Sequence, residues 1–145
     1  MKTTKKYCVK LNEDHNASED QIIGKVFKYL KSPFGNDVAE FSRGEAIKKA
    51  RMFGGRIEVS REVKYLFIQL QENNSEHSYC HKSVHEVKAD VDNDTLANDY
   101  ASDFYGSNSV KEDGKYHFFS SSIVIEIEKV EEIEESEFNT LKKYL

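Results

Sequence analysis

The residues Val63-Lys-Tyr-Leu-Phe-Ile-Gln-Leu70 are apolar at odd and at even positions alike. A strand presents alternate residues to its two faces, so apolar side chains at both parities indicate a strand that is covered on both sides. The turn-forming residues Glu72-Asn-Asn-Ser-Glu76 come soon after it. This stretch therefore predicts the central strand of a sheet, and the other elements can be placed around it.

Four more segments have strand character. Residues 6–11 and residues 56–59 alternate between apolar and polar side chains, and residues 116–130 form a long extended segment with its isoleucines on one side. Residues 79–87 fit a helix or a strand by pattern. Their place after the turn favours a hairpin with the central strand.

Four segments are predicted to be helices. Ser18 and Gln21 have capping-box spacing, and the apolar residues from Ile22 to Leu30 then share one side of a helix that ends near Pro33. Residues 43–53 form a second helix, which Gly54-Gly55 closes. The third and fourth follow Asp94 and Ser136 as caps.

These elements predict a single α+β domain over residues 1–145, with a mainly antiparallel sheet and about four helices packed on one face of it. The chain has 145 residues, a usual size for one domain, and it contains no fixed-period repeat and no glycine- or proline-rich linker. The sequence therefore gives no reason to expect a second domain.

Composition restricts the function and the location. The net charge of −5 disfavours a general binder of polyanions, which would be strongly basic. No signal-peptide pattern follows the first residues, and no stretch approaches the roughly 20 apolar residues of a membrane span. We therefore expect a cytoplasmic protein in which Cys8 and Cys80 are free thiols.

His77, His81 and His85 recur every four residues around Cys80. On a helix the three imidazoles would form a stripe able to hold a transition metal, whereas on a strand they would be too widely spaced to meet at one ion. Because a strand is favoured here and no second Cys/His pair matches, we expect surface histidines and no metal site. Metal binding stays open as an alternative.

No enzyme motif is complete. Asp90, Asp92 and Asp94 begin like a calcium loop, but Thr95 and Ala101 stand where that loop needs glycine and glutamate. Phosphate-binding glycine loops and nucleophile elbows are missing from the sequence. The sequence predicts no catalytic residue, no cofactor and no enzymatic activity, with a small enzyme as a remote alternative.

Charge is segregated along the chain. The basic segment, residues 43–64, has seven basic residues against three acidic ones, and the acidic segment, residues 126–137, has seven glutamates against Lys129. A second acidic stretch covers residues 86–103. Such runs are often only solvated faces, but an acidic surface can also meet a basic groove on a partner.

Two stretches resemble small phage and prophage proteins of low-GC Gram-positive bacteria. The first is Phe41-Ser-Arg-Gly-Glu-Ala-Ile-Lys-Lys-Ala-Arg-Met-Phe-Gly-Gly-Arg-Ile-Glu58, a helix that ends in Gly-Gly and enters a strand. The second is Ile133-Glu-Glu-Ser-Glu-Phe-Asn-Thr-Leu-Lys-Lys-Tyr-Leu145. Many proteins of this group counter host systems, anti-CRISPR inhibitors among them, and the resemblance implies such a role in a bacterial host cell.

We therefore expect a non-enzymatic accessory protein that binds and inhibits a host or defence protein, such as a CRISPR–Cas nuclease complex. The residues predicted to bind this partner are the glutamates of the acidic segment: Glu126, Glu128, Glu131, Glu132, Glu134 and Glu135. The alternative is a nucleic-acid-binding module, which would use basic residues of the basic segment: Lys48, Lys49, Arg51, Arg56 and Arg61.

Overall fold

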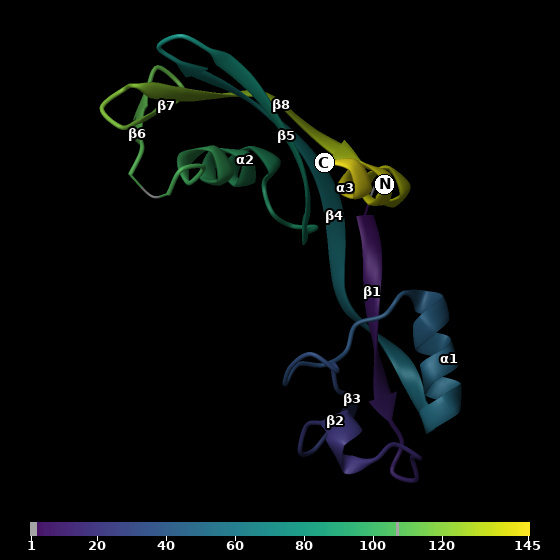
Figure 1. Cartoon of the computed structure of the whole chain (residues 1–145). Helices are drawn as coiled ribbons and strands as arrows, with labels where there is room; N and C mark the ends of the chain where they lie inside the picture. Colours follow the sequence, from purple (N-terminus) through teal and green to yellow (C-terminus); the bar gives the residue numbers. More distant parts are fainter. Residues whose placement is uncertain (1–2, 107) are drawn as a thin grey trace. The chain divides into compact units, whose positions relative to one another are not determined.

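The computed structural model describes residues 3–106 and 108–145 (Figure 1). The chain has the α+β fold predicted from its sequence, with an antiparallel sheet of eight strands in the order β2-β3-β1-β4-β8-β7-β6 and with β5 paired to β4. The strands are β1 (Thr3–Leu11), β2 (Ile22–Ile23), β3 (Tyr29–Leu30), β4 (Gly55–Asn74), β5 (Ser78–Lys88), β6 (Val110–Glu112), β7 (Lys115–Phe118) and β8 (Ile123–Ile133). The described residues form three α-helices, not the four predicted: α1 (Arg43–Phe53), α2 (Asn93–Ser102) and α3 (Glu135–Tyr144).

The chain divides into two compact units. We call Thr4–Val63 the N-terminal unit, and Lys64–Leu145, to which the start of the chain up to Thr3 also belongs, the C-terminal unit. The long strand β4 contributes to both. The N-terminal unit has 12 basic and 9 acidic residues, a net charge of +3. Residues 64–145 of the C-terminal unit include 8 basic and 17 acidic residues, a net charge of −9. The basic and acidic residues, which are separated along the chain, therefore also lie in different units: the N-terminal unit is positive and the C-terminal unit is negative.

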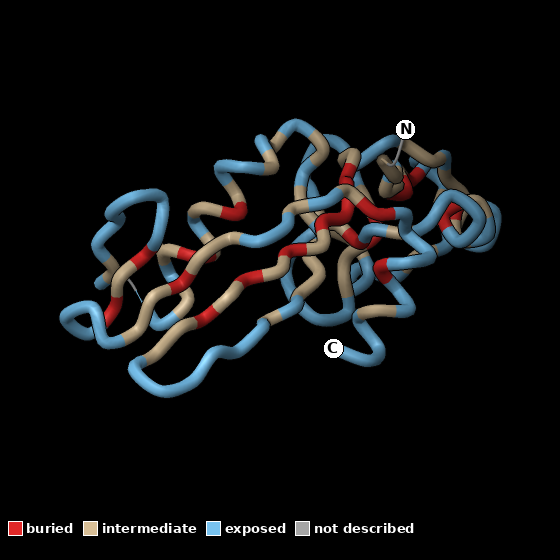
Figure 2. The backbone as a smooth tube through the Cα atoms, turned by 90° about the horizontal axis from the view of Figure 1, so that it is seen from above, coloured by how far each residue is buried: buried red, intermediate tan, exposed pale blue. Residues whose placement is uncertain are grey.

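The core of the C-terminal unit lies between its sheet and α2. Leu66, Ile68 and Leu70 of β4 are fully buried, and the small residues Ala97 and Ala101 of α2 pack on them. Alanines on the buried side of α2 let the helix lie close to the strands. Figure 2 shows how buried positions alternate with more exposed ones along the strands.

The opposite face of this sheet is covered by α3. Tyr65 directly precedes Leu66 on β4 and points to the other side, where its ring contacts the ring of Phe138 at 4.6 Å between centroids. Both faces of β4 are thus buried, as its apolar residues at both parities predicted. The prediction that the helices share one face was wrong, because a strand buried on two sides needs a cover on each.

The core of the N-terminal unit is built by β1, β3 and α1, with Val9, Leu30 and Ala46 buried at its centre. Helix α1 has the predicted bounds. Its cap Ser42 accepts a hydrogen bond from the Glu45 backbone N–H at 3.3 Å, and it ends at Gly54, whose φ of +80° is the left-handed conformation that favours glycine. Local signals and packing agree in this helix.

The helix predicted between its cap Ser18 and Pro33 is not formed. The capping box at Ser18 is present, but it begins only a single 3-10 turn over Glu19–Gln21. Strands β2 and β3 then pair as a small hairpin, and Gly24 in its loop has a φ of +112°. Two of the residues expected on the buried side of that helix, Val26 and Phe27, are exposed.

Several further predictions can be compared with the structure. Residues 56–59 and 63–70 are parts of one strand, β4, and residues 78–88 form the hairpin strand that was favoured for this region. The long extended segment 116–130 is interrupted, because Phe119, Ser120 and Ser121 adopt positive φ values and turn the chain from β7 into β8. Helices α2 and α3 each begin two residues earlier than predicted, after Asp92 and Glu134. None of the helices in the described ranges is long and apolar enough to cross a membrane.

Candidate functional site

The acidic segment does not form one continuous patch, because most of it lies on strand β8, where successive side chains point to opposite faces. Glu126 lies 3.8 Å from the Lys115 ammonium, and Glu131 lies 3.0 Å from the Lys129 ammonium. Glu128 accepts a hydrogen bond from the Gln69 side chain at 2.6 Å. These glutamates are individually paired.

The remaining glutamates of this set have structural roles. Glu132 lies 3.5 Å from the ammonium of the buried Lys64 and accepts a hydrogen bond from Asn93 at 3.1 Å. Glu134 is the N-cap of α3, and Glu135 is in its first turn, where carboxylates are favoured by the helix dipole. The acidic segment therefore contributes charge to the C-terminal unit but no concave site.

The basic segment is also distributed over different environments. Lys48 and Arg51 are exposed on α1, whereas Lys49 is half-buried. Arg56 lies 3.8 Å from the carboxylate of Glu58. The five candidate residues for nucleic-acid binding thus do not converge on one surface element.

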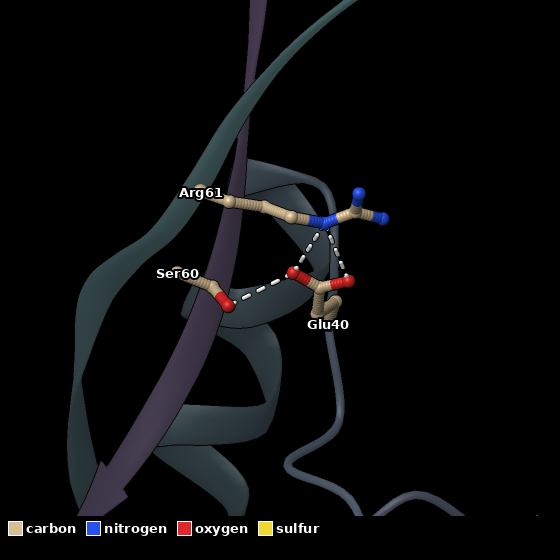
Figure 3. Close-up of polar contacts among 3 residues, drawn as sticks. All are labelled: Glu40, Ser60 and Arg61. Carbon is tan, nitrogen blue, oxygen red and sulfur yellow. Dashed lines mark hydrogen bonds and ion pairs between the residues drawn. The ribbon is translucent and has the colours of Figure 1, made fainter. Parts of the chain in front are cut away.

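The last of the five, Arg61, is engaged with Glu40. Its Nε donates to both carboxylate oxygens, at 3.0 and 2.9 Å, and Ser60 donates to the same carboxylate at 2.8 Å (Figure 3). Burial alone would raise the pKa of Glu40, but the hydrogen bonds from Arg61 and Ser60 outweigh it and lower that pKa. This contact joins β4 to the segment that precedes α1, so it serves the fold of the N-terminal unit.

A concave site is found in the C-terminal unit, beside the edge strand β5. Within the part of the chain that the structure describes, β5 pairs with β4 and with no other strand. Between this strand and the helices α2 and α3 lies a groove of about 710 Å³, which we call the edge groove. Its lining comes from these three elements: Val84, His85, Glu86, Val87, Leu96, Asp99, Tyr100, Asp103, Phe104, Phe138 and Lys142.

The floor of the edge groove is aromatic, and its rim is mainly acidic. The ring of Tyr100 lies 4.6 Å from that of His85 and 6.0 Å from that of Phe104, both in edge-to-face arrangements. Asp99 and Asp103 are exposed on α2 at the rim of this cluster. Aromatic rings surrounded by polar groups are typical of the places where a partner side chain is buried.

A buried carboxylate supports this floor from the sheet side. Glu72 of β4 has only 4% of its surface exposed, and it accepts hydrogen bonds from His81, at 3.1 Å, and from the hydroxyl of Tyr105. The hydrogen bond to Glu72 raises the pKa of Tyr105 to about 12, so this phenol stays a donor at neutral pH. The ring of His81 in turn lies 4.7 Å from that of Phe104. The contacts tie the end of α2 to β4 and β5.

The three histidines that the sequence singled out have different surroundings. His77 is exposed next to Tyr79, His81 bonds to Glu72, and His85 bonds to Ser83 Oγ at 2.7 Å. Among the described residues no group of three or more His, Cys, Asp or Glu side chains could hold a metal ion. Two of the three histidines thus belong to the scaffold of the edge groove.

The stability of the C-terminal unit should depend on pH through His85. Burial lowers the pKa of His85, so the folded chain keeps it neutral at pH values where the unfolded chain already binds a proton. The free energy of unfolding should therefore be highest above about pH 7.5 and fall as the pH drops through about 6.5. Urea denaturation between pH 5.5 and 8 should show this fall in the wild type and a smaller one in His85→Gln. The exposed His77→Gln is the matched control, and an unchanged pH profile in His85→Gln would contradict the assignment.

Sequence reasoning found part of this site. It noted the acidic stretch of residues 86–103 but ranked the acidic segment above it, because the number of charges along a strand does not reveal which face each one occupies. The alternation of His81, His85 and Val87 on β5 was the signal for a face that packs against α2. Searches with protein-family models, among curated proteins and among solved structures find no match to this chain.

Proposed function

We propose that this protein is a non-enzymatic inhibitor that binds a host or defence protein stoichiometrically. The most specific candidate for this partner is a CRISPR–Cas nuclease complex. The observation that supports this most is the edge groove, an acid-rimmed aromatic cleft beside the edge strand β5, in a unit whose residues 64–145 carry a net charge of −9. The resemblance to phage accessory proteins points to the same class of target.

The negative charge of the C-terminal unit indicates which kind of partner it would bind. Proteins that hold nucleic acids present basic grooves to the phosphate backbone, and an acidic unit is complementary to such a groove. A patch of one sign also accelerates the encounter, with rate gains of roughly 10-fold or more at low salt. We therefore assign the acidic unit the task of occupying a basic channel of the partner and excluding its nucleic acid.

The position of β5 at the edge of the sheet suggests how the partner attaches. An exposed strand edge offers backbone N–H and C=O groups that an extended segment of a partner can pair with, and pockets beside the edge then select its side chains. The edge groove provides such pockets, with Tyr100 and Phe104 as the aromatic contacts and with Asp99 and Asp103 for basic side chains. An extended, lysine- or arginine-containing segment fits these features.

The test compares two charge reversals in the same unit. Asp99→Lys with Asp103→Lys alters the rim of the edge groove, and both lysines stand near the C-terminal end of α2, where a positive charge is favourable for the helix. Glu128→Lys with Glu131→Lys makes the same change of charge on β8. Each variant is added to CRISPR–Cas nuclease complexes of low-GC Gram-positive bacteria, and co-elution and DNA cleavage are measured.

We expect the wild type to co-elute with one effector and to abolish its cleavage near a 1:1 ratio. The Asp99/Asp103 variant should bind at least about 10-fold more weakly, and the Glu128/Glu131 variant should bind nearly as well as the wild type. A wild type that neither binds nor inhibits any effector tested would contradict the proposed target. Loss of binding only in the Glu128/Glu131 variant would move the interface to β8.

A further inference from the structure

A second groove lies in the N-terminal unit, beside the loop that joins β2 to β3. It has a volume of about 490 Å³, and we call it the Phe27 groove. The end of β1, the β2–β3 loop and the start of β4 line it: Lys10, Leu11, Asn12, Glu13, Val26, Phe27, Lys28 and Arg56. All of these residues belong to the N-terminal unit, so the groove is independent of the acidic unit and of the inhibitor function proposed above.

The loop presents apolar side chains to solvent at the edge of this groove. Phe27 is 58% exposed and Val26 is 84% exposed. The ammonium of Lys10 lies 4.0 Å from the centre of the Phe27 ring, a distance at which a cation is attracted to the ring face. Aromatic rings exposed beside lysines are the platforms on which proteins stack nucleobases.

The loop that carries Phe27 has a defined shape. Gly24 has a φ of +112°, and a Cβ at this position would overlap the carbonyl oxygen of Phe27. The Leu11 backbone N–H donates to the Lys28 carbonyl at 2.8 Å, which fixes the end of the loop to β1. The backbone therefore holds the ring at the rim of the groove.

The groove also carries positive charge. Lys10, Lys28 and Arg56 line it, against the single carboxylate of Glu13. Glu58 lies between two of these cations, at 3.9 Å from Lys10 and 3.8 Å from Arg56, and it also accepts a hydrogen bond from Tyr29 at 3.0 Å. One cation in excess remains at the groove itself, within a unit of net charge +3.

We propose that the Phe27 groove binds single-stranded nucleic acid, with a base stacked on the Phe27 ring and the adjoining phosphates held by Lys10, Lys28 and Arg56. Stacking tolerates any base, so the site should have little sequence preference. Of the five basic residues that the sequence offered as an alternative nucleic-acid site, this groove includes only Arg56.

The chain has no tryptophan, which permits a direct test. Phe27→Trp introduces a single tryptophan at the groove, which can be excited at wavelengths where the tyrosines absorb little, and a base that stacks on it should quench its emission. Phe34→Trp is the matched control, because Phe34 is 97% exposed and lies outside the groove lining. We expect saturable quenching of Trp at position 27 by a thymidine oligonucleotide and none at position 34. Equal quenching at both positions, or none at position 27, would overturn the proposal.

Charge variants in the Phe27→Trp background then locate the phosphates. Replacing Lys10, Lys28 and Arg56 with alanine should weaken oligonucleotide binding about 10-fold or more. In the Phe27→Trp variant with these three residues intact, a plot of the logarithm of the affinity against the logarithm of the salt concentration should have a slope of about −2. Replacing Lys48, Lys49 and Arg51 with alanine makes the same change of charge on α1 and should have little effect. A loss confined to this second variant, or equally tight binding of thymidine monophosphate, would contradict a nucleic-acid site in the Phe27 groove.

Discussion

Gly55→Ala should cost the N-terminal unit at least about 3 kcal/mol in its free energy of unfolding. A Cβ at Gly55 would overlap the Lys10 carbonyl oxygen and lie 3.2 Å from the Leu11 Cα, both of them backbone atoms of the adjoining strand β1. A flexible side chain could turn away, but two paired strands can make room only by separating. Urea denaturation followed by circular dichroism measures the loss.

Gly44→Ala is the matched control, since it adds the same methyl group to the same unit. No atom lies within 4 Å of a Cβ at Gly44, and the residue is in the first turn of α1. Alanine is the better helix former, so this variant should be more stable than the wild type by up to about 1 kcal/mol. Equal stability of the two alanine variants would show that β1 and β4 do not approach closely at Gly55.

Glu132→Lys should destabilise the C-terminal unit by about 3 kcal/mol. Only 8% of the Lys64 side chain is exposed, and its ammonium donates to the Val91 carbonyl and lies 3.5 Å from Glu132. A lysine at position 132 would set a second ammonium beside one that has little water around it. The free energy of unfolding in urea again provides the measurement.

Two further variants separate this pair from a general effect of charge. Glu128→Lys makes the same change at an exposed position of the same strand and should cost less than about 0.5 kcal/mol. Exchanging the pair, with Lys64→Glu and Glu132→Lys together, restores opposite charges and should recover part of the loss. Similar costs for Glu132→Lys and Glu128→Lys would mean that Lys64 is not confined as the structure has it.

The elements that could be predicted from the sequence are those in which local signals and burial coincide. Helix α1 was placed at its observed bounds because a serine cap, the buried alanines and a left-handed glycine all mark the same segment. The segment after Ser18 also has a capping box and a helical apolar pattern. It nevertheless forms the paired strands β2 and β3, because tertiary pairing can override local helix signals. Capping signals fix where a helix can start, not whether tertiary packing will continue it.

The candidate sites divide in the same way. The sequence by itself determined the α+β class, the central strand buried on both faces, and the separation of a basic segment from acidic ones along the chain. Only the tertiary structure decided which charges act together. Successive residues of β8 point to opposite faces of the sheet, so its glutamates are separated, and Glu132 lies beside Lys64 of the neighbouring strand. The packing of α2 beside β5 brings Asp99 and Asp103 to the edge groove. The physical reason is that charge is set by composition, while the side of a strand on which a residue lies, and the element packed against it, depend on long-range pairing.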